Sequence, residues 1–443
     1  MNATRSDAAP VFIEPARELQ VIGNADVVVV GGGPGGFGAA LSAGRQGART
    51  LVVERFGALG GTWTTGLLSA IMVNSSVKGI FAEFRDRMEA RGGWIYRIPG
   101  DPFSEGNYDS EIAKVVLDEM AAQAGVGVLY FAQAVHAFKN AAGRRITGVA
   151  IQSKEGRHVV TGNIFIDGSG DGDLSALAGV PFELGREGDR ALQPMTLIFK
   201  MDRVDTDRAY AYLRTDGNCR KAWQAAKARG EVTVPREDVL LNSLPKEGQW
   251  EFNCTRLIGY DGTRLRDVSA AMTEGRRQVG EIVAFMRRNI PGFENAVLCE
   301  TAPHVGVRET RRVKCDYTVT GDDIRAGRKF PDVIARGNWP IDIHNPKGEG
   351  TNCEYEVLAP GDYYTVPYRS ITAHGLDNLL VASRCIDATH EAHAAIRASP
   401  QICAIGEAAG VAAALVVARK LASVRDVEVE EVQNRLRKAG ALV

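Results

Sequence analysis

Apolar and polar positions along the chain predict a set of buried strands. Short runs of β-branched and apolar residues are typical of parallel strands, which are covered on both faces of their sheet. Such runs stand at Val27–Val30, Thr50–Val53, Asn163–Ile166 and Asn378–Ala382. Shorter segments separated by turn residues predict a β-meander inserted into the same sheet. These segments are Val128–Phe131, Ile146–Ile151 and His158–Thr161.

Apolar residues spaced three and four positions apart predict helices between the strands. The expected helices are Phe37–Gln46, 77–92, Glu111–Ala124, Leu174–Ala178, Val268–Asn289, Pro400–Ala418 and Gln433–Lys438. Alternation through His304–Tyr317 predicts a further strand, with Arg308 and Arg312 on one face and Arg311 on the other. Helices that alternate with buried strands indicate an α/β fold with a parallel sheet.

A glycine motif joins the first predicted strand to the first predicted helix. The spacing G-x-G-x-x-G falls on Gly31, Gly33 and Gly36, with Pro34 and Gly35 between them. In this motif the first glycine makes the turn, the second admits a pyrophosphate, and the third lets the helix pack closely on the strand. The helix then offers its N-terminal amides to the phosphates. The chain is therefore expected to bind a dinucleotide.

The acid that ends the second strand narrows the choice of dinucleotide. Glu54 follows Thr50–Val53 directly, at the position that binds ribose hydroxyls. An acid there argues against a 2′-phosphate, which leaves FAD or NAD. A second glycine loop, Gly57-Ala58-Leu59-Gly60-Gly61-Thr62, offers another backbone approach to a ligand. Trp63 follows this loop and either covers the ligand or belongs to the core.

Composition and charge change the picture only a little. The 443 residues are 45% hydrophobic, enough for two domains, and the net charge of −1 gives no bias toward nucleic acid or an anionic membrane. Seven cysteines without C-x-x-C spacing fit reduced thiols and no metal site. The N-terminus lacks the apolar core of a signal peptide, and the apolar segment Ala408–Ala418 is too short to cross a bilayer. We expect a soluble, cytoplasmic protein.

Composition also divides the chain. Residues from about 185 to 360 carry more charge, many prolines and three of the five tryptophans. We expect a lead-in at 1–23, a nucleotide-binding domain in two parts at 24–184 and 362–425, an inserted substrate domain at 185–361, and a C-terminal helix at 426–443.

Four phrases carry a family resemblance. They are VVVVGGGPGGFGAA…VVER, LGGTWTTG, FIDGSGDGDLSALAG, and NLLVASRCIDATHEAHAAIRASPQICAIGEAAGVAAAL. In this order they resemble the FAD-dependent oxidoreductases with a glutathione-reductase-type FAD domain. Within that family the chain is most similar to the soluble group related to the heterodisulfide-reductase flavin subunit, and distantly to fumarate reductases and aspartate oxidases. The resemblance implies a Rossmann-like FAD-binding domain with an inserted α+β substrate domain.

The resemblance also implies where FAD would lie. Asp171 and Asp173, either side of Gly172, suit the ribityl chain, unless this loop is only a charged turn. The N-terminus of Pro400–Ala418 would face the pyrimidine edge of the flavin, unless this helix is purely structural. The residues expected to contact FAD are Gly31, Gly33, Pro34, Gly35, Gly36, Glu54, Arg55, Gly60, Gly61, Thr62, Asp171, Gly172, Asp173, Arg384, Gln401 and Ile402.

The source of electrons is inferred from the motifs that occur once or not at all. No second G-x-G-x-x-G lies within 185–360, and no C-x-x-C pair is present to relay electrons. Electrons are therefore expected to pass directly between a substrate and N5 of the flavin. The other half-reaction is left to oxygen, a quinone or a separate reductase.

Candidate active-site residues follow the last predicted strand. His390 and His393 can move the proton that accompanies hydride transfer, and Arg397 can hold a carboxylate. A metal at His390-Glu391-x-His393 is disfavoured because no third ligand is evident. Arg308, His344 and Arg369 are further candidates, with a solvated basic strand as the alternative for Arg308.

The expected function is hydride transfer between a small polar, oxygenated or carboxylated substrate and flavin. Two rival functions remain open. One is a non-redox enzyme, a hydratase or isomerase that uses reduced FAD. The other is a non-catalytic, FAD-bound electron-transfer subunit, against which the absence of cysteine clusters counts.

Overall fold

The computed structural model describes residues 11–72, 77–96, 104–354, 358–359 and 361–443. Residues 1–10 of the expected lead-in lie outside this range. The largest sheet has the strand order β6-β2-β1-β9-β8-β7, and β20 also pairs with β9. Its strands are β1 (Val21–Val30), β2 (Thr50–Val53), β6 (Gly127–Leu129), β7 (Gln133–Lys139), β8 (Ile146–Ser153), β9 (Gly156–Asp167) and β20 (Leu379–Val381). The prediction of an α/β, Rossmann-like fold is confirmed.

Parallel pairing brings four strand ends to one edge of this sheet. Val30 of β1 lies beside Val53 of β2 and beside Asp167 of β9, and Asp167 lies beside Val381 of β20. Ligands of open α/β sheets bind outside the carboxyl ends of the strands. Every loop that the sequence assigns to FAD starts from one of these four ends.

The meander differs from the predicted one. The first two residues of the segment predicted at Val128–Phe131 belong to β6, which pairs in parallel with β2. The antiparallel strands are instead β7, β8 and the first half of β9; β9 also runs parallel to β1 from Val159 onward, and on its other side β20 replaces β8 in the second half. The strands expected at His158–Thr161 and Asn163–Ile166 are thus one continuous strand. A strand that changes neighbours halfway along shows no break in its own sequence.

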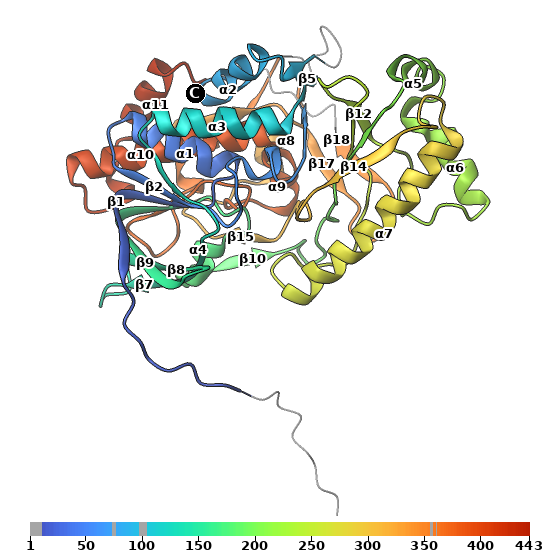
Figure 1. The fold of residues 1–443 in the computed structure, drawn as a ribbon. Helices are drawn as coiled ribbons and strands as arrows, with labels where there is room; N and C mark the ends of the chain where they lie inside the picture. The colour runs from blue at the N-terminus through green and yellow to red at the C-terminus, as the bar shows by residue number, and fades with distance from the viewer. Residues whose placement is uncertain (1–10, 73–76, 97–103, 355–357, 360) are drawn as a thin grey trace, which may run out of the picture.

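The sheet is covered by α1 (Pro34–Arg45), α10 (Ser399–Arg419) and α3 (Ser110–Gln123). Although α1 and α10 are far apart in the sequence, they pack against each other. Figure 1 shows these helices above β1 and β2, with the meander strands below them. Gly35 faces Ile402 and Gly406, and Gly410 faces Ala39 and Ser42. Later residues of α1 contact later residues of α10, so the two helices run parallel and their N-termini point the same way.

Helix α10 is 21 residues long and apolar enough to cross a membrane by length and composition alone. The prediction that no apolar segment reaches this length, based on Ala408–Ala418, was therefore too strict. However, 89% of the apolar window is buried inside the fold. The hydrophobicity of α10 is that of a core helix packed against α1, α2 and the sheet.

A second hydrophobic core is built from residues between 195 and 305, together with Leu67. It holds a sheet in the order β12-β13-β11-β14. The strands are β11 (Phe199–Asp202), β12 (Leu241–Ser243), β13 (Trp250–Phe252) and β14 (Val297–Thr301), and the helices are α5 (Thr206–Leu213), α6 (Arg220–Ala228) and α7 (Leu265–Asn289). Figure 1 shows these helices together on one side of the molecule. Buried residues from Val313 onward pack in the first core, so the two cores divide near residue 310.

Smaller elements complete the fold. The sheets are β3 (Ala70–Met72), β4 (Trp94–Ile95) and β5 (Ser104–Tyr108); β10 (Phe182–Leu184) with β15 (Arg311–Val313); β16 (Val333–Gly337) with β19 (Tyr364–Pro367); and β17 (Ile341–His344) with β18 (Thr351–Glu354). The helices are α2 (Ile80–Glu89), α4 (Asp173–Leu177), α8 (Gly321–Arg325), α9 (His390–Ile396), α11 (Val429–Lys438) and the 3-10 turns η1 (Gly61–Trp63), η2 (Gly217–Cys219), η3 (Tyr368–Ser370) and η4 (Val424–Asp426).

The strand predicted over His304–Tyr317 is much shorter in the structure. Only Arg311–Val313 forms a strand, β15. Arg308 lies in the loop before it, where its Nη1 donates to the carbonyl of Pro194 and to Oγ1 of Thr196. Alternation failed here because buried polar contacts, not a sheet, satisfy the backbone and side chains of this segment.

Candidate functional site

The first glycine loop is shaped by contacts that only glycine permits. Gly31 has φ of +93°, and its amide donates to the carbonyl of Val53 at 2.8 Å. A β-carbon on Gly31 would lie 2.6 Å from the carbonyl oxygen of Gly168, and one on Gly36 would lie 1.8 Å from that of Gly31. The first and third glycines therefore have the predicted roles in the turn and in helix packing.

Gly33 differs from its neighbours because its missing side chain faces open space. It is the N-cap of α1 with φ of −64°, a value open to any residue. A β-carbon there would meet nothing nearer than the carbonyl oxygen of Gly168 at 4.0 Å. Pro34 follows at the first helical position, where its missing amide hydrogen is of no consequence. The start of α1 thus has room for a phosphate beside the backbone amides.

Glu54 is 4% exposed and holds the loop that surrounds it. Its Oε2 accepts from the amide of Gly32 at 2.7 Å, and its Oε1 accepts from the amide of Phe56 at 2.7 Å. Burial raises the pKa of this carboxyl above its usual value, while the two amides oppose the shift. Each oxygen retains a second lone pair for a ribose hydroxyl. Arg55 lies 4.8 Å over the Phe56 ring.

The second glycine loop contacts the first. The amide of Gly60 donates to the carbonyl of Gly32 at 2.8 Å, and a β-carbon on Gly61 would lie 3.0 Å from Cα of Gly33. Thr62 follows in η1. Trp63 is fully buried and stacked on Phe84 at 5.0 Å, so it belongs to the core. Its Nε1 donates to Oγ of Ser399, the first residue of α10, at 2.8 Å.

The loop after β9 brings a buried carboxylate to the same edge of the sheet. Asp171 accepts from Nη2 of Arg384 and from Oγ1 of Thr310, each at 2.6 Å. Burial raises the pKa of Asp171, but Arg384, the hydrogen bond from Thr310 and the charge of Arg55 together outweigh it, and the pKa lies below its usual value. A β-carbon on Gly170 would lie 2.7 Å from this guanidinium. Asp171 and Arg384 therefore form one ion pair across the loop.

Gly172 and Asp173 begin α4. Gly172 has φ of +67°, and a β-carbon on it would lie 2.7 Å from Val313. Asp173 accepts from Nη1 of Arg311 at 2.8 Å. Burial and then Asp171 raise the pKa of Asp173. The pKa of Asp171 is thus lowered and the pKa of Asp173 is raised, although the two acids lie within one turn.

The N-terminus of α10 completes this edge. A β-carbon on Gly35 would lie 3.0 Å from Cγ2 of Ile402, so α10 begins beside the glycine loop of α1. The Gln401 side chain turns away, and its Oε1 accepts from the Tyr364 hydroxyl at 3.1 Å. Two parallel helices direct their positive ends to one place, which favours an extended anionic ligand. Open space at Gly33 and the carboxylate of Glu54 fit FAD there.

Two of the predicted catalytic residues, Arg397 and His344, meet at Asp342. Nη2 of Arg397 contacts Oδ2 of Asp342 at 3.3 Å, and Nε2 of His344 lies 3.6 Å from the same oxygen. Burial lowers the pKa of His344 well below its usual value, and the nearby cations Arg308 and Arg397 lower it further. His344 is therefore a neutral ring beside guanidinium groups. Arg397 stands one residue before Ala398, the N-cap of α10.

The other two predicted histidines lie on α9 beside a carboxylate that the sequence did not single out. Nδ1 of His390 lies 2.9 Å from Oε1 of Glu309, which also contacts Nη1 of Arg312 at 2.6 Å. Since the carboxylate accepts, Nδ1 donates and Nε2 is left as the second functional atom of the ring. His393 is 2% exposed, and burial lowers its pKa to about 3. His393 is therefore neutral at physiological pH.

Arg369 is not brought to this group. Its Nε donates to Oδ2 of Asp332 at 2.9 Å, and its guanidinium lies 4.9 Å over the Tyr317 ring. The residues that sequence reasoning missed are Arg236, Arg256 and Glu309. Arg236 and Arg256 stand far from any motif. Glu309 directly follows Arg308, but a single acid in a basic segment carries no recognisable signal.

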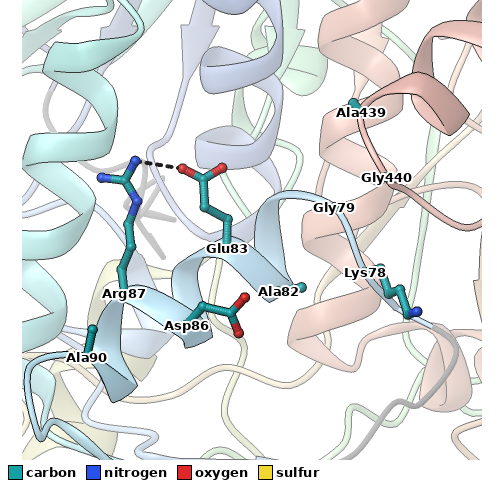
Figure 2. Close-up of a pocket in the computed structure, with 9 residues that line it drawn as sticks. All are labelled: Lys78, Gly79, Ala82, Glu83, Asp86, Arg87, Ala90, Ala439 and Gly440. Carbon is teal, nitrogen blue, oxygen red and sulfur yellow. Dashed lines mark ion pairs between the residues drawn. The ribbon is translucent and has the colours of Figure 1, made fainter.

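A separate hollow of about 460 Å³ lies on the outer side of α2 and the C-terminal turn, away from the glycine loops. Figure 2 shows its lining residues and the ion pair between Glu83 and Arg87. Lys78 and Asp86 are exposed, and the lining includes glycines and alanines as well as charged side chains. The chemistry of the buried edge described above has no counterpart there.

Comparison with known proteins assigns the family. The sequence model described as FAD dependent oxidoreductase matches residues 26–436. The chain therefore belongs to the FAD dependent oxidoreductase family, and FAD is its cofactor.

The individual proteins that resemble this chain match it either over a short segment or at low sequence identity. The chain is 65% identical to dihydrolipoyl dehydrogenase of Trypanosoma brucei brucei over 37 residues, which are 8% of each protein. The match thus spans less than a tenth of that enzyme. A solved structure, a geranylgeranyl bacteriochlorophyll reductase-like protein from Thermoplasma acidophilum, shares the fold with a TM-score of 0.50 and 14% identity, over 94% of this chain and 84% of that one.

Proposed function

We propose that this protein transfers hydride between a small carboxylated substrate and N5 of FAD, without an NAD(P)H domain of its own. The observation that carries the proposal is the meeting of Arg397 and His344 at Asp342, next to the N-terminus of α10, with Arg308 close enough for its charge to lower the pKa of His344. FAD, when bound, supplies the hydride acceptor or donor. The residues of the chain hold the substrate anion and move a proton.

The arginines suit the first task. A guanidinium binds a carboxylate through two parallel hydrogen bonds and fixes its orientation. Arg397 uses Nη2 on Asp342 and keeps Nε without a partner among the described residues. Within the described part of the chain, Arg308 makes hydrogen bonds only through Nη1. Both side chains are therefore anchored at one atom and retain donors for a ligand.

His390 suits the second task better than His393. Glu309 orients the ring of His390 through Nδ1, and a histidine held in this way by a carboxylate can serve as a proton carrier. The Nε2 atom of His390 has no partner among the described residues. His393 has a pKa of about 3, so its ring is neutral near pH 7 and is unsuited to donate a proton there.

The reoxidant is proposed to be external: oxygen, a quinone or a separate reductase. Kinship with the heterodisulfide-reductase flavin subunit, and more distantly with fumarate reductase and aspartate oxidase, would agree with an external redox partner. Two alternatives make different demands. A hydratase or isomerase would turn over substrate without changing the flavin redox state, and an electron-transfer subunit would bind no small substrate.

Anaerobic photoreduction of the purified protein, followed by a screen of oxidants and of carboxylated substrates, tests the proposal. Hydride transfer requires a substrate that bleaches oxidised FAD or reoxidises photoreduced FAD. An Arg397→Lys variant should raise KM for that substrate with little change in FAD content, because lysine lacks the planar fork. Substrate conversion with no flavin absorbance change in either redox state would overturn the proposal.

A further inference from the structure

Arg236 is a buried cation without hydrogen-bond partners for its side chain. The residue is 5% exposed, and Nε is fully enclosed and unpartnered. Among the described residues no group accepts a hydrogen bond from this guanidinium, and the nearest carboxylate, Asp238, lies 3.7 Å from Nη2. Its backbone is well held, since its carbonyl accepts from Nε1 of Trp223 at 2.9 Å and from Nζ of Lys227 at 3.1 Å.

Such an arrangement opposes folding unless something else uses the donors. A guanidinium has five N–H donors in a fixed fork, and burying a charge without hydrogen bonds is strongly unfavourable. Natural proteins retain groups of this kind where a ligand needs them. The rigid backbone of Arg236 aims the fork at one place, which suits the binding of an anion.

The surroundings of Arg236 connect it to the proposed substrate site. Nη2 of Arg256 lies 3.8 Å from Glu237, the residue after Arg236, and 3.4 Å from Nδ1 of His344. His344 in turn faces Asp342 and Arg397. Arg308 experiences the charges of Arg397, Arg236 and Arg256. The guanidinium of Arg236 thus shares one buried region with the residues placed beside α10.

The charges in this region leave a single positive charge in excess. The four guanidiniums belong to Arg236, Arg256, Arg308 and Arg397, and the carboxylates that face them among the described residues are Glu237, Asp238 and Asp342. Burial raises the pKa of Glu237, but a hydrogen bond from its own amide and the charges of Arg256 and Arg236 together lower it below its usual value, so Glu237 stays ionised. His344 is neutral because its pKa is lowered. One negative charge on a ligand would balance the region, and a second would exceed it.

We propose that Arg236 joins Arg308 and Arg397 in binding the single carboxylate of the substrate, and that the site selects monocarboxylates over dicarboxylates. This inference rests on the proposed function, because it takes the bound anion to be the substrate of that reaction. The binding of the anion does not itself depend on any redox step. The carboxylate forms a two-point contact with the unpartnered fork of Arg236. A dicarboxylate of similar size would bring its second charge against Asp342, Glu237 and Asp238.

The test is the binding of anions to FAD-loaded protein. Binding is measured by the shift in melting temperature and by the flavin absorbance difference spectrum. The probes are propionate, lactate and benzoate, compared with malonate and succinate at equal ionic strength. Monocarboxylates are expected to bind and dicarboxylates to bind at least tenfold more weakly. Arg236→Met should weaken monocarboxylate binding roughly 10- to 100-fold, the usual loss for a charged hydrogen-bonded contact. Arg229→Met, an exposed arginine near the end of α6, is the control and should change nothing.

A second measurement guards against a variant that merely misfolds. Since the Arg236 guanidinium donates no hydrogen bond among the described residues and lies 3.7 Å from its nearest carboxylate, Asp238, Arg236→Met should melt at the same or a higher temperature than wild type without ligand. Equal binding of monocarboxylates to wild type and to Arg236→Met would overturn the inference, and so would tighter binding of dicarboxylates. Arg236-dependent binding of anions that never change the flavin redox state would instead contradict the proposed function and leave this inference standing.

Discussion

Gly406 of α10 rests on the carbonyl oxygen of Gly35 in α1, and a β-carbon on Gly406 would lie 1.9 Å from that oxygen. No side chain tolerates this distance, so the contact keeps the two helices at backbone separation. Gly35 is the second residue of α1, directly after the phosphate-binding turn. The position of the α10 N-terminus, and of Arg397 just before it, therefore depends on a contact between two glycines.

Gly406→Ala should push α10 away from α1. We expect the free energy of unfolding to fall by about 1–3 kcal/mol, the usual penalty for overpacking a tight contact, together with weaker FAD binding. Gly280→Ala in α7 is the matched control, because a β-carbon there meets nothing within 4 Å. That variant should gain stability by about 0.5–1 kcal/mol. Urea unfolding and FAD titration of both proteins measure the effect, and equal stability of the two would contradict the contact.

Gly33→Val should abolish FAD binding while the apoprotein still folds. The valine side chain would enter the open space beside the first amides of α1, where a phosphate would lie. The melting temperature of the holoprotein would drop because the stabilisation by bound ligand is lost. Flavin content and circular dichroism measure the two effects. Full flavin content in this variant would show that the loop does not touch the phosphates.

Glu407 should make the protein less stable as the pH rises toward neutrality. Burial raises the pKa of this carboxyl from 4.5 to about 7, and its Oε2 accepts from the amide of Ile80 at 3.1 Å. A raised carboxyl pKa contributes stability that is fully present below pH 4.5 and is lost as the pH rises through 7. The loss is on the order of 3 kcal/mol.

Glu407→Gln keeps the acceptor for Ile80 and removes the titration. Its unfolding free energy should therefore vary less than that of wild type between pH 4.5 and 7.5. Denaturant unfolding at a series of pH values measures the difference. Parallel curves for the two proteins would show that Glu407 does not titrate in this range.

NADH and NADPH alone should reduce the flavin slowly. The sequence holds one nucleotide fingerprint, at Gly31–Gly36, which serves FAD, and none within 185–360. Stopped-flow mixing under anaerobic conditions measures the rate. Rapid bleaching that saturates at micromolar nicotinamide nucleotide would overturn the expectation of an external redox partner.

His390→Gln should retain FAD and slow the substrate-driven step by roughly 10²- to 10⁴-fold, the usual contribution of a positioned acid or base. His136→Gln, at an exposed position on β7, is the control and should have wild-type rates. Single-turnover flavin reduction with the identified substrate separates this step from product release. Wild-type rates in His390→Gln would return the residue to a structural role beside Glu309.

Several parts of the fold were predictable because their signals are local. The turn at Gly31, the packing at Gly36 and the acid at position 54 lie within one βα unit, where each residue type has one conformational reason to be present. The limits of α7 and α10 were likewise close to prediction. The meander was predicted less well, because β9 pairs with three strands and its sequence does not reveal where its partners change.

The sequence by itself determined the α/β class, the dinucleotide loop and the edge of the sheet where FAD belongs. Only the tertiary structure decided that Trp63 is a core residue, that Arg369 pairs with Asp332 instead of joining the site, and that Arg236 lies unpartnered near His344. The physical reason is the separation along the sequence of the residues that interact. Backbone turns and helix periodicity are determined by neighbouring residues, whereas this buried cluster of charges is assembled by packing segments that are spread between residues 236 and 397.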